Sequence, residues 1–270
     1  MHWPGLSVSN TAEPHSHVWT AMAWDGKKSL LAPDLHFNRL LRHSKILGIE
    51  IEDDFLIIIH NKLEKQIQFN NLDILNYEIP FLIKFIFQKN GDISLIIRRN
   101  KYWHDNPLRA ISMKLPNFEL PILGTKHGNW EPYNDARRLA ISHDSDLALL
   151  FNNDLLIDGD HCTPLMLDSD GIAYHPSNLD GALDSVTLEL LKNGIEESGI
   201  PIRSAKINLK MLSRASELIV IGSGMGICPV GSIDGTLIGN PKGKLYQIAR
   251  EVWLNKLNND WSNWDTLREL

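Results

Sequence analysis

The first half of the chain combines one helical pattern with several short apolar runs. Apolar residues recur at helical spacing over 34–48 and Gly48 ends the pattern, which predicts an amphipathic helix. Its apolar stripe consists of Phe37, Leu40, Leu41 and Leu47. Runs rich in β-branched and aromatic residues predict strands at 55–59, 66–70, 79–88 and 93–99, with a hairpin turn at 89–92. We therefore expect one helix and a largely antiparallel sheet.

The predicted helix carries a second stripe, which is polar. His36, Arg39 and His43 follow one another at spacings of three and four residues, so they share one side of the helix. Polar stripes of this kind are most often exposed to water. The pattern alone therefore favours a solvated face for these three residues.

The second half alternates helical patterns with short strands. Helices are predicted near 132–143, 183–197 and 243–257, and strands at 147–151, 154–157, 165–168 and 216–221. Asp234-Gly235 predicts a hairpin turn. The prolines of an irregular stretch mark the junction between the halves, namely Pro107, Pro116 and Pro121. We expect a smaller α/β domain at 1–117, a linker at 118–124 and a larger domain at 125–270.

Composition narrows the class of protein. The chain has 270 residues, 43% of them hydrophobic and 22% charged, which is typical of soluble globular proteins with room for two domains. A formal charge of −6 argues against a nucleic-acid partner. The apolar runs are far shorter than the ~20 residues of a membrane span. Two cysteines without a CxxC pair, and a start unlike a signal peptide, predict a cytoplasmic protein.

Two turns in the second half are candidate anion sites. Gly222-Ser-Gly-Met-Gly226 is rich in glycine, but Ile227-Cys-Pro-Val230 follows it. The helix required by a dinucleotide site cannot begin at this proline-containing segment. The hydroxyl of Ser223 and nearby amides could still bind one phosphate. The second candidate is 180–183, at the start of the predicted helix. An ordinary helix start capped by Asp180, Asp184 or Ser185 is an equally good interpretation.

Metal ligation is not expected. The groups at 15–17, 143–146 and 158–162 mix histidine, aspartate and cysteine, yet none repeats a known ligand spacing.

Lys126 lies within 120–129, directly after the stretch rich in proline. Most lysines are solvated surface charges, so this residue alone is weak evidence. A lysine amine can form a Schiff base with an aldehyde, and two candidate phosphate-binding turns follow it along the chain. This combination suggests an enzyme that holds pyridoxal phosphate on Lys126.

In chain order these segments resemble the class IV, or fold-type IV, pyridoxal-phosphate enzymes. That family includes branched-chain and D-amino-acid aminotransferases and aminodeoxychorismate lyases. His36-Phe-Asn-Arg-Leu40 is similar to the family's His-x-x-Arg-Leu helix, and Thr125-Lys-His-Gly-Asn129 to its Schiff-base lysine segment, closest to the lyase branch. Asp158-Gly159 stands where the family has Glu-Gly. Segments 180–183 and 222–230 are similar to its phosphate-binding turns.

The resemblance implies a two-domain α/β (α+β) fold of the D-amino-acid aminotransferase type and a role for each residue. Lys126 would bind pyridoxal phosphate and act as the catalytic base. Arg39, Ser223 and the main chain near Ala182 would hold the cofactor phosphate, and Asp158 would pair with the pyridine nitrogen. The implied cofactor-binding set is Arg39, Lys126, Asp158, Ala182, Leu183, Ser223 and Gly224.

Several positions depart from the family pattern. Pro14-His-Ser-His17 replaces a Gly-Asp-Gly, and Asp158 is one methylene shorter than the usual glutamate. Ala21 stands where some lyases have threonine, and Ala23 where relatives carry a cationic residue. The tyrosine that aminotransferases place five residues after the lysine is Glu131 here, with Tyr133 as a candidate substitute.

We therefore expect a 4-amino-4-deoxychorismate lyase-like enzyme that releases pyruvate to give 4-aminobenzoate for folate synthesis. The alternatives are an aminotransferase of branched-chain or D-amino acids and a non-catalytic relative. The expected partner is a small-molecule amine substrate, with no nucleic acid and no membrane, and the resemblance implies a homodimer.

Overall fold

Two units interleave along the chain in the computed structural model, which describes residues 13–69, 80–100 and 105–269. Among these, the N-terminal unit contains 13–69, 80–100, 126–128 and 255–269, and the C-terminal unit contains 105–125 and 129–254. The short segment Lys126–Gly128 thus belongs to the N-terminal unit, although the residues on both sides of it belong to the other.

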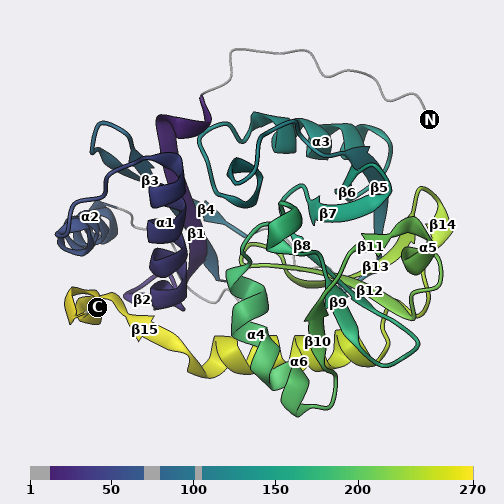
Figure 1. Cartoon of the computed structure of the whole chain (residues 1–270). Coiled ribbons are helices and arrows are strands. Elements are labelled where there is room, and N and C mark those ends of the chain that lie inside the picture. The colour runs from purple at the N-terminus through teal and green to yellow at the C-terminus, as the bar shows by residue number, and fades with distance from the viewer. Residues whose placement is uncertain (1–12, 70–79, 101–104, 270) are drawn as a thin grey trace. The chain divides into compact units, whose positions relative to one another are not determined.

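The N-terminal unit is built on an antiparallel sheet in the order β15-β2-β1-β3-β4 (Figure 1). Its strands are β1 (His17–Trp24), β2 (Ser29–Leu31), β3 (Phe81–Gln88), β4 (Ile93–Arg99) and β15 (Trp261–Asn263). β3 and β4 pair from Phe81↔Arg99 to Phe87↔Ile93. The predicted strands at 79–88 and 93–99 and the turn between them are confirmed, apart from residue 79, which lies outside the described residues.

One face of this sheet packs under two helices, α1 (Pro33–Leu47) and α2 (Phe55–Phe69). Phe37 of α1 contacts Phe85 edge-on, with ring centroids 5.6 Å apart, and Phe55 of α2 contacts Phe87 at 5.8 Å. Side chains alternate between the faces of a strand, so Trp19, Ala21 and Lys84 point to the opposite face of the sheet. The predicted helix at 34–48 is confirmed.

The strands predicted at 55–59 and 66–70 are wrong, because 55–69 is the helix α2 and residue 70 lies outside the described residues. Phe55, Ile59 and Leu63 are buried at a spacing of four residues. Ile57, between them, is 48% exposed. A short apolar run fits a strand or one side of a helix, and here burial continues past the run at helical spacing.

The C-terminal unit is built on a mixed sheet of ten strands among the described residues. The order is β10-β9-β8-β12-β13-β5-β6-β7-β11, and β14 pairs with β13. The strands are β5 (Leu108–Lys114), β6 (Leu147–Asn152), β7 (Leu155–Gly159), β8 (Thr163–Leu167), β9 (Ala173–His175), β10 (Ile202–Ser204), β11 (Ile207–Asn208), β12 (Glu217–Gly222), β13 (Gly226–Ile233) and β14 (Thr236–Leu237). The strands predicted in this half are confirmed.

Helices α3 (Glu131–Ser142), α4 (Val186–Glu197), α5 (Leu209–Leu212) and α6 (Lys244–Asn259) complete the α-helices of the described chain. The short 3-10 helices are η1 (Pro14–Ser16), η2 (Ile122–Gly124), η3 (Asn178–Asp180) and η4 (Trp264–Glu269). The predicted helix at 183–197 begins three residues late, because the Ser185 side chain caps α4 by accepting a hydrogen bond from the Leu188 amide at 3.3 Å. Ala182 and Leu183 therefore precede the helix.

The glycine-rich turn at 222–226 joins two antiparallel strands, β12 and β13. A strand follows it directly, which confirms that a dinucleotide-binding helix does not start there. The hairpin predicted at Asp234-Gly235 is also confirmed, since both residues have positive φ, 49° and 78°, as a type I′ turn requires.

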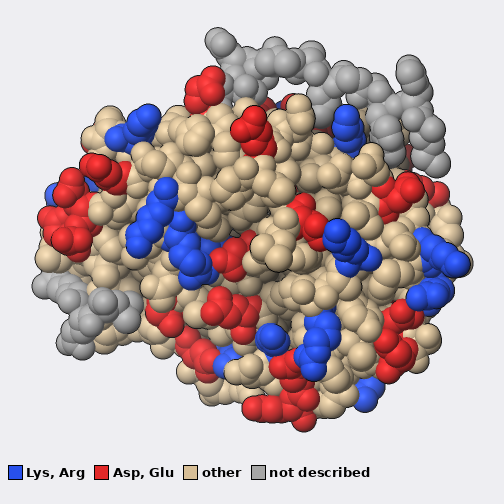
Figure 2. Space-filling model, viewed as in Figure 1, with Lys and Arg blue, Asp and Glu red and all other residues tan. Residues whose placement is uncertain are grey.

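Acidic and basic side chains are interspersed on the face shown in Figure 2, in line with the modest net charge. Within the described ranges, every helix falls short of the length and apolar character that crossing a bilayer demands.

Candidate active site

The Lys126–Gly128 segment is attached to the edge of β1 by main-chain hydrogen bonds. The Trp19 amide donates to the Lys126 carbonyl at 3.1 Å, and the Gly128 amide donates to the Pro14 carbonyl at 2.9 Å. The indole nitrogen of Trp19 donates to the His127 carbonyl at 3.1 Å. Lys126 itself is only 9% exposed. The lysine therefore has a fixed backbone and a largely buried side chain.

Gly128 allows this close approach. A Cβ at Gly128 would lie 2.2 Å from the Ser16 hydroxyl oxygen and 2.6 Å from the Glu13 carbonyl oxygen, both shorter than real contacts. The segment 13–17, which stands where the family pattern has Gly-Asp-Gly, thus packs directly against the chain that follows Lys126.

Two lysine side chains contact the same indole ring. The Nζ of Lys126 lies 4.5 Å from the centroid of Trp19, and the Nζ of Lys84 lies 3.9 Å from it. Both distances are within cation–π range. Lys84 is the register partner of Ala21, so a cation stands directly across the strand pair from one of the two alanines that depart from the family pattern.

The polar stripe of α1 is buried, so the expected solvated face is wrong. His36, Arg39 and His43 are 3%, 4% and 3% exposed. Buried polar groups are tolerated where they are hydrogen-bonded, and this stripe bonds to β1 and to the lysine segment. Arg39 Nη2 donates to the Thr20 hydroxyl at 3.0 Å, and that hydroxyl bonds His36 Nδ1 at 2.9 Å. His43 Nδ1 accepts the Lys126 amide at 3.1 Å.

The histidines of this cluster are neutral. Burial, followed by the charges of Arg39 and Lys126, lowers the pKa of His36 well below its usual value and that of His43 to about 2. Burial and then the Lys126 charge lower the pKa of His127 to about 4. The positive charge of the cluster consequently belongs to Arg39 and Lys126, a pattern that suits an anionic group such as a phosphate.

In the C-terminal unit, Asp158 lies at the end of β7 and is 6% exposed. Its Oδ1 accepts the Gly159 amide at 2.9 Å, and its Oδ2 accepts the Leu183 amide at 3.2 Å. Two main-chain donors thus orient the carboxylate. The Leu183 amide, which the resemblance implies as a phosphate donor, is engaged by Asp158 in this structure.

Ser223 and Gly224 lie in the turn between β12 and β13. The Ser223 hydroxyl is 3.3 Å from the hydroxyl of Thr187, in the first turn of α4. Ala182 is buried, and a Cβ at Gly124 would lie 3.0 Å from its carbonyl oxygen. The structure therefore brings the C-terminal members of the predicted set together around the approach to α4.

Glu131 and Tyr133 differ sharply in environment. Glu131 is bound on the surface by Arg138 and by Asn134. Tyr133 is 2% exposed and stacks on Trp130 with centroids 4.2 Å apart. Burial and then the Asp158 charge raise its pKa, so its phenol stays protonated. Of these two residues, Tyr133 is therefore the one whose side chain lies near Asp158.

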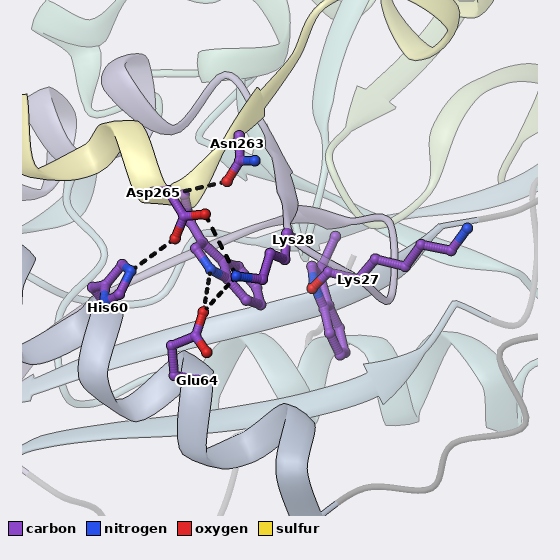
Figure 3. Close-up of polar contacts among 8 residues, drawn as sticks. Lys27, Lys28, His60, Glu64, Asn263 and Asp265 are labelled. Atoms are coloured by element: carbon purple, nitrogen blue, oxygen red, sulfur yellow. Dashed lines mark hydrogen bonds and ion pairs between the residues drawn. The ribbon is translucent and has the colours of Figure 1, made fainter.

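A separate polar cluster joins three elements of the N-terminal unit (Figure 3). His60 and Glu64 of α2 and Asp265 of η4 lie close enough to bind an ion. The ammonium of Lys28 already lies 3.0 Å from Glu64 Oε1 and 3.4 Å from Asp265 Oδ2, and His60 Nε2 bonds Asp265 Oδ1 at 2.9 Å. Lys28 thus supplies the positive charge between the two carboxylates, which fits a structural ion-pair cluster.

Several residues of the lysine cluster were absent from the sequence-based set. They are Trp19, Thr20, His43 and Lys84. Trp19 and Thr20 lie in a strand and His43 in a polar stripe, and only the register of β1 and β3 places Lys84 beside Trp19. The one usable signal was the spacing of His43 four residues after Arg39, on the same side of the predicted helix.

The chain is similar in sequence to known proteins. Residues 17–233 match the family model for class IV amino-transferases. A D-alanine aminotransferase from Staphylococcus haemolyticus is 24% identical over 117 residues, which cover 43% of this chain and only 40% of that protein.

Solved structures extend the likeness over most of the chain. A branched-chain aminotransferase from Thermoproteus uzoniensis superposes with a TM-score of 0.78 at 17% identity, covering 93% of this chain and 90% of that one. A proposed 4-amino-4-deoxychorismate lyase from Legionella pneumophila gives 0.71 at 21% identity, covering 91% of each chain. Other structures of this fold contain pyridoxal phosphate or a phosphopyridoxyl compound. These likenesses confirm the predicted α/β fold type.

Proposed function

The chain belongs to the class IV aminotransferase family, and we propose that it binds pyridoxal phosphate through Lys126 to act on a small primary amine. The observation that carries the proposal is the buried Lys126, held by main-chain bonds beside a buried arginine and neutral histidines. A lysine in such surroundings is not a solvated surface charge. Its segment also lies within the part of the chain that matches the family model.

The donor chemistry in the two units fits this cofactor. Arg39 is oriented by Thr20 and supplies a guanidinium for a phosphate. The hydroxyl of Ser223 and the amide of Gly224 supply neutral donors. An anion at Ala182 or Leu183 would compete for those amides with the Ser177 carbonyl and the Asp158 carboxylate, respectively. The carboxylate of Asp158, oriented by two amides, is suited to pair with a protonated pyridine nitrogen.

When bound, pyridoxal phosphate withdraws electrons from the carbon that bears the substrate amine, so a proton on that carbon becomes acidic. The amine of Lys126 would accept that proton as the general base. The carboxylate of Asp158 would hold the pyridine nitrogen protonated, and Arg39 would keep the phosphate in place. Trp19, in contact with Lys126, would limit where its amine can move.

Within the family we propose a 4-amino-4-deoxychorismate lyase-like reaction for folate synthesis, in which pyruvate leaves and 4-aminobenzoate forms. The lysine segment Thr125-Lys-His-Gly-Asn129 supports the lyase branch. Lys84 adds a cation on the Trp19 face, and burial, followed by the charge of Arg98, lowers its pKa to about 8. It therefore stays charged at pH 7 and suits a substrate with two carboxylates. We also propose a homodimer located in the cytoplasm.

The second candidate is an aminotransferase of branched-chain or D-amino acids, favoured by the likeness to the Thermoproteus uzoniensis and Staphylococcus haemolyticus proteins. It differs in requiring a keto-acid acceptor. A third candidate is a relative that binds the cofactor without turnover, favoured by Ala21 and Ala23.

The deciding experiment is the visible absorbance spectrum of the purified protein with pyridoxal phosphate, recorded for wild type and Lys126→Ala. We expect a band near the visible edge that requires Lys126. Lys84→Ala is the matched control, because Lys84 contacts the same indole ring and its variant should keep the band. Failure of the wild type to produce the band would sink the catalytic proposal.

Turnover then separates the candidates. Pyruvate release from aminodeoxychorismate without any keto acid indicates the lyase. Amino-group transfer that depends on a keto acid indicates the aminotransferase, and a band without turnover of either kind indicates the non-catalytic relative.

A further inference from the structure

His43 links the two candidate cofactor ligands of the N-terminal unit. It lies four residues after Arg39 on α1, so both side chains leave the same side of one helix. Arg39 reaches Thr20 on β1, whereas His43 accepts the main-chain amide of Lys126 across 83 positions of sequence. One helix therefore carries the phosphate-binding candidate Arg39 and also contacts the backbone of Lys126.

The Lys126 amide donates to the His43 side chain. Between this segment and the chain around β1, the Lys126 carbonyl accepts the Trp19 amide, and the Gly128 amide donates to the Pro14 carbonyl. Nδ1 of His43 accepts the Lys126 amide at 3.1 Å in the interior of the unit. A buried amide that loses its acceptor costs about a factor of ten or more in an equilibrium.

The imidazole is held in the form that this bond requires. A protonated Nδ1 would be a donor and could not accept the amide. Burial, then the charges of Arg39 and Lys126, lower the pKa of His43 to about 2, so Nδ1 is available as an acceptor at neutral pH.

We propose that His43 is a positioning residue that sets the backbone of Lys126 relative to Arg39, and hence the lysine amine relative to the cofactor phosphate. This inference rests on the proposed function. It assigns to His43 no contact with substrate or cofactor. Its effect should appear in how efficiently Lys126 becomes attached to pyridoxal phosphate, more than in whether the phosphate binds.

The test compares His43→Leu, which removes the acceptor at similar volume, with His43→Asn, whose side-chain oxygen can replace Nδ1. Ser44→Ala is the matched control, since Ser44 is equally buried on α1 and its hydroxyl donates to the Leu41 carbonyl of the same helix at 3.0 Å. Two quantities are measured on the full-length protein. One is amide hydrogen exchange of the 120–129 peptide without cofactor, and the other is the fraction of protein trapped covalently by borohydride at saturating pyridoxal phosphate.

We expect His43→Leu to speed exchange of the peptide about tenfold and to reduce the trapped fraction several-fold, while His43→Asn and Ser44→Ala stay near wild type. Equal trapping in His43→Leu and wild type would overturn the inference, as would equal losses in the Leu and Asn variants at equal thermal stability. If wild type itself traps no cofactor, the proposed function has failed, and this appears before any variant is compared. The inference would then be overturned with it.

Discussion

The Leu183 amide donates a hydrogen bond to Asp158 Oδ2 at 3.2 Å, which ties the end of β7 to the loop before α4. The Gly159 amide binds the other oxygen at 2.9 Å. A carboxylate with two main-chain donors is fixed in direction even though it is one methylene shorter than the glutamate of the family pattern.

Replacing Asp158 by asparagine should separate binding from chemistry. The amide keeps one oxygen acceptor but loses the charge that pairs with a protonated ring nitrogen, a charge-assisted bond whose loss corresponds to roughly 10- to 100-fold. We expect turnover to fall by that factor while the cofactor content stays near one per chain. Stopped-flow turnover beside a cofactor assay measures both, and full activity in Asp158→Asn would contradict the role.

Lys84 should contribute to binding a carboxylate of the substrate. Its pKa, lowered to about 8, means that it is charged at pH 7 and loses its proton as the pH rises. We expect KM of wild type to rise above about pH 8 and kcat to change little. In Lys84→Met, KM should be raised roughly tenfold at pH 7 and should lose this dependence on pH. An unchanged KM profile in the variant would exclude Lys84 from substrate binding.

Gly128→Ala should displace the lysine segment. The new Cβ would meet the Ser16 hydroxyl and the Glu13 carbonyl at 2.2 and 2.6 Å. Overpacking of this kind costs about 1–3 kcal/mol, which urea unfolding can measure. The Lys126-dependent absorbance band should weaken in parallel. Adding Ser16→Ala removes the closest contact, so the double variant should recover part of the stability, and no recovery would locate the strain elsewhere.

The Lys28 cluster should make the protein sensitive to acid (Figure 3). Hydrogen bonding, to Lys28 for Glu64 and to His60 for Asp265, lowers the pKa of both carboxyls from their ordinary values of 4.5 and 3.8. Groups with a lowered folded pKa stabilise the protein above their unfolded pKa, and that contribution is lost as the pH falls through the folded value. The urea concentration at the midpoint of unfolding should therefore decrease as the pH falls below about 4.5.

In Lys28→Met the urea midpoint should decrease less on acidification than in wild type, since the substitution removes the cation that lowers the Glu64 pKa. Lys27→Met is the control, because Lys27 is exposed and it is the adjacent Lys28 whose ammonium pairs with Glu64 and Asp265. Identical pH profiles for wild type and Lys28→Met would show that the cluster does not contribute.

The family and most of the secondary structure could be recognised from the sequence, which also pointed to Lys126 as the candidate Schiff-base residue. Local signals sufficed there, because helical spacing, turn residues such as Asp234-Gly235 and ordered motifs are properties of short segments. It misjudged 55–69, where a short apolar run is compatible with either a strand or a helix, and only packing against Phe87 decides.

Tertiary structure alone decided the environment of the site. The polar stripe of α1 is indistinguishable from a solvated face until β1 and the lysine segment cover it and satisfy its hydrogen bonds. Likewise, strand register places Lys84 opposite Ala21. The fold also brings His43 to the main-chain amide of Lys126, 83 residues away in the sequence, with which it forms a hydrogen bond. Burial and long-range hydrogen bonds join segments that are distant in sequence, so no local pattern encodes them.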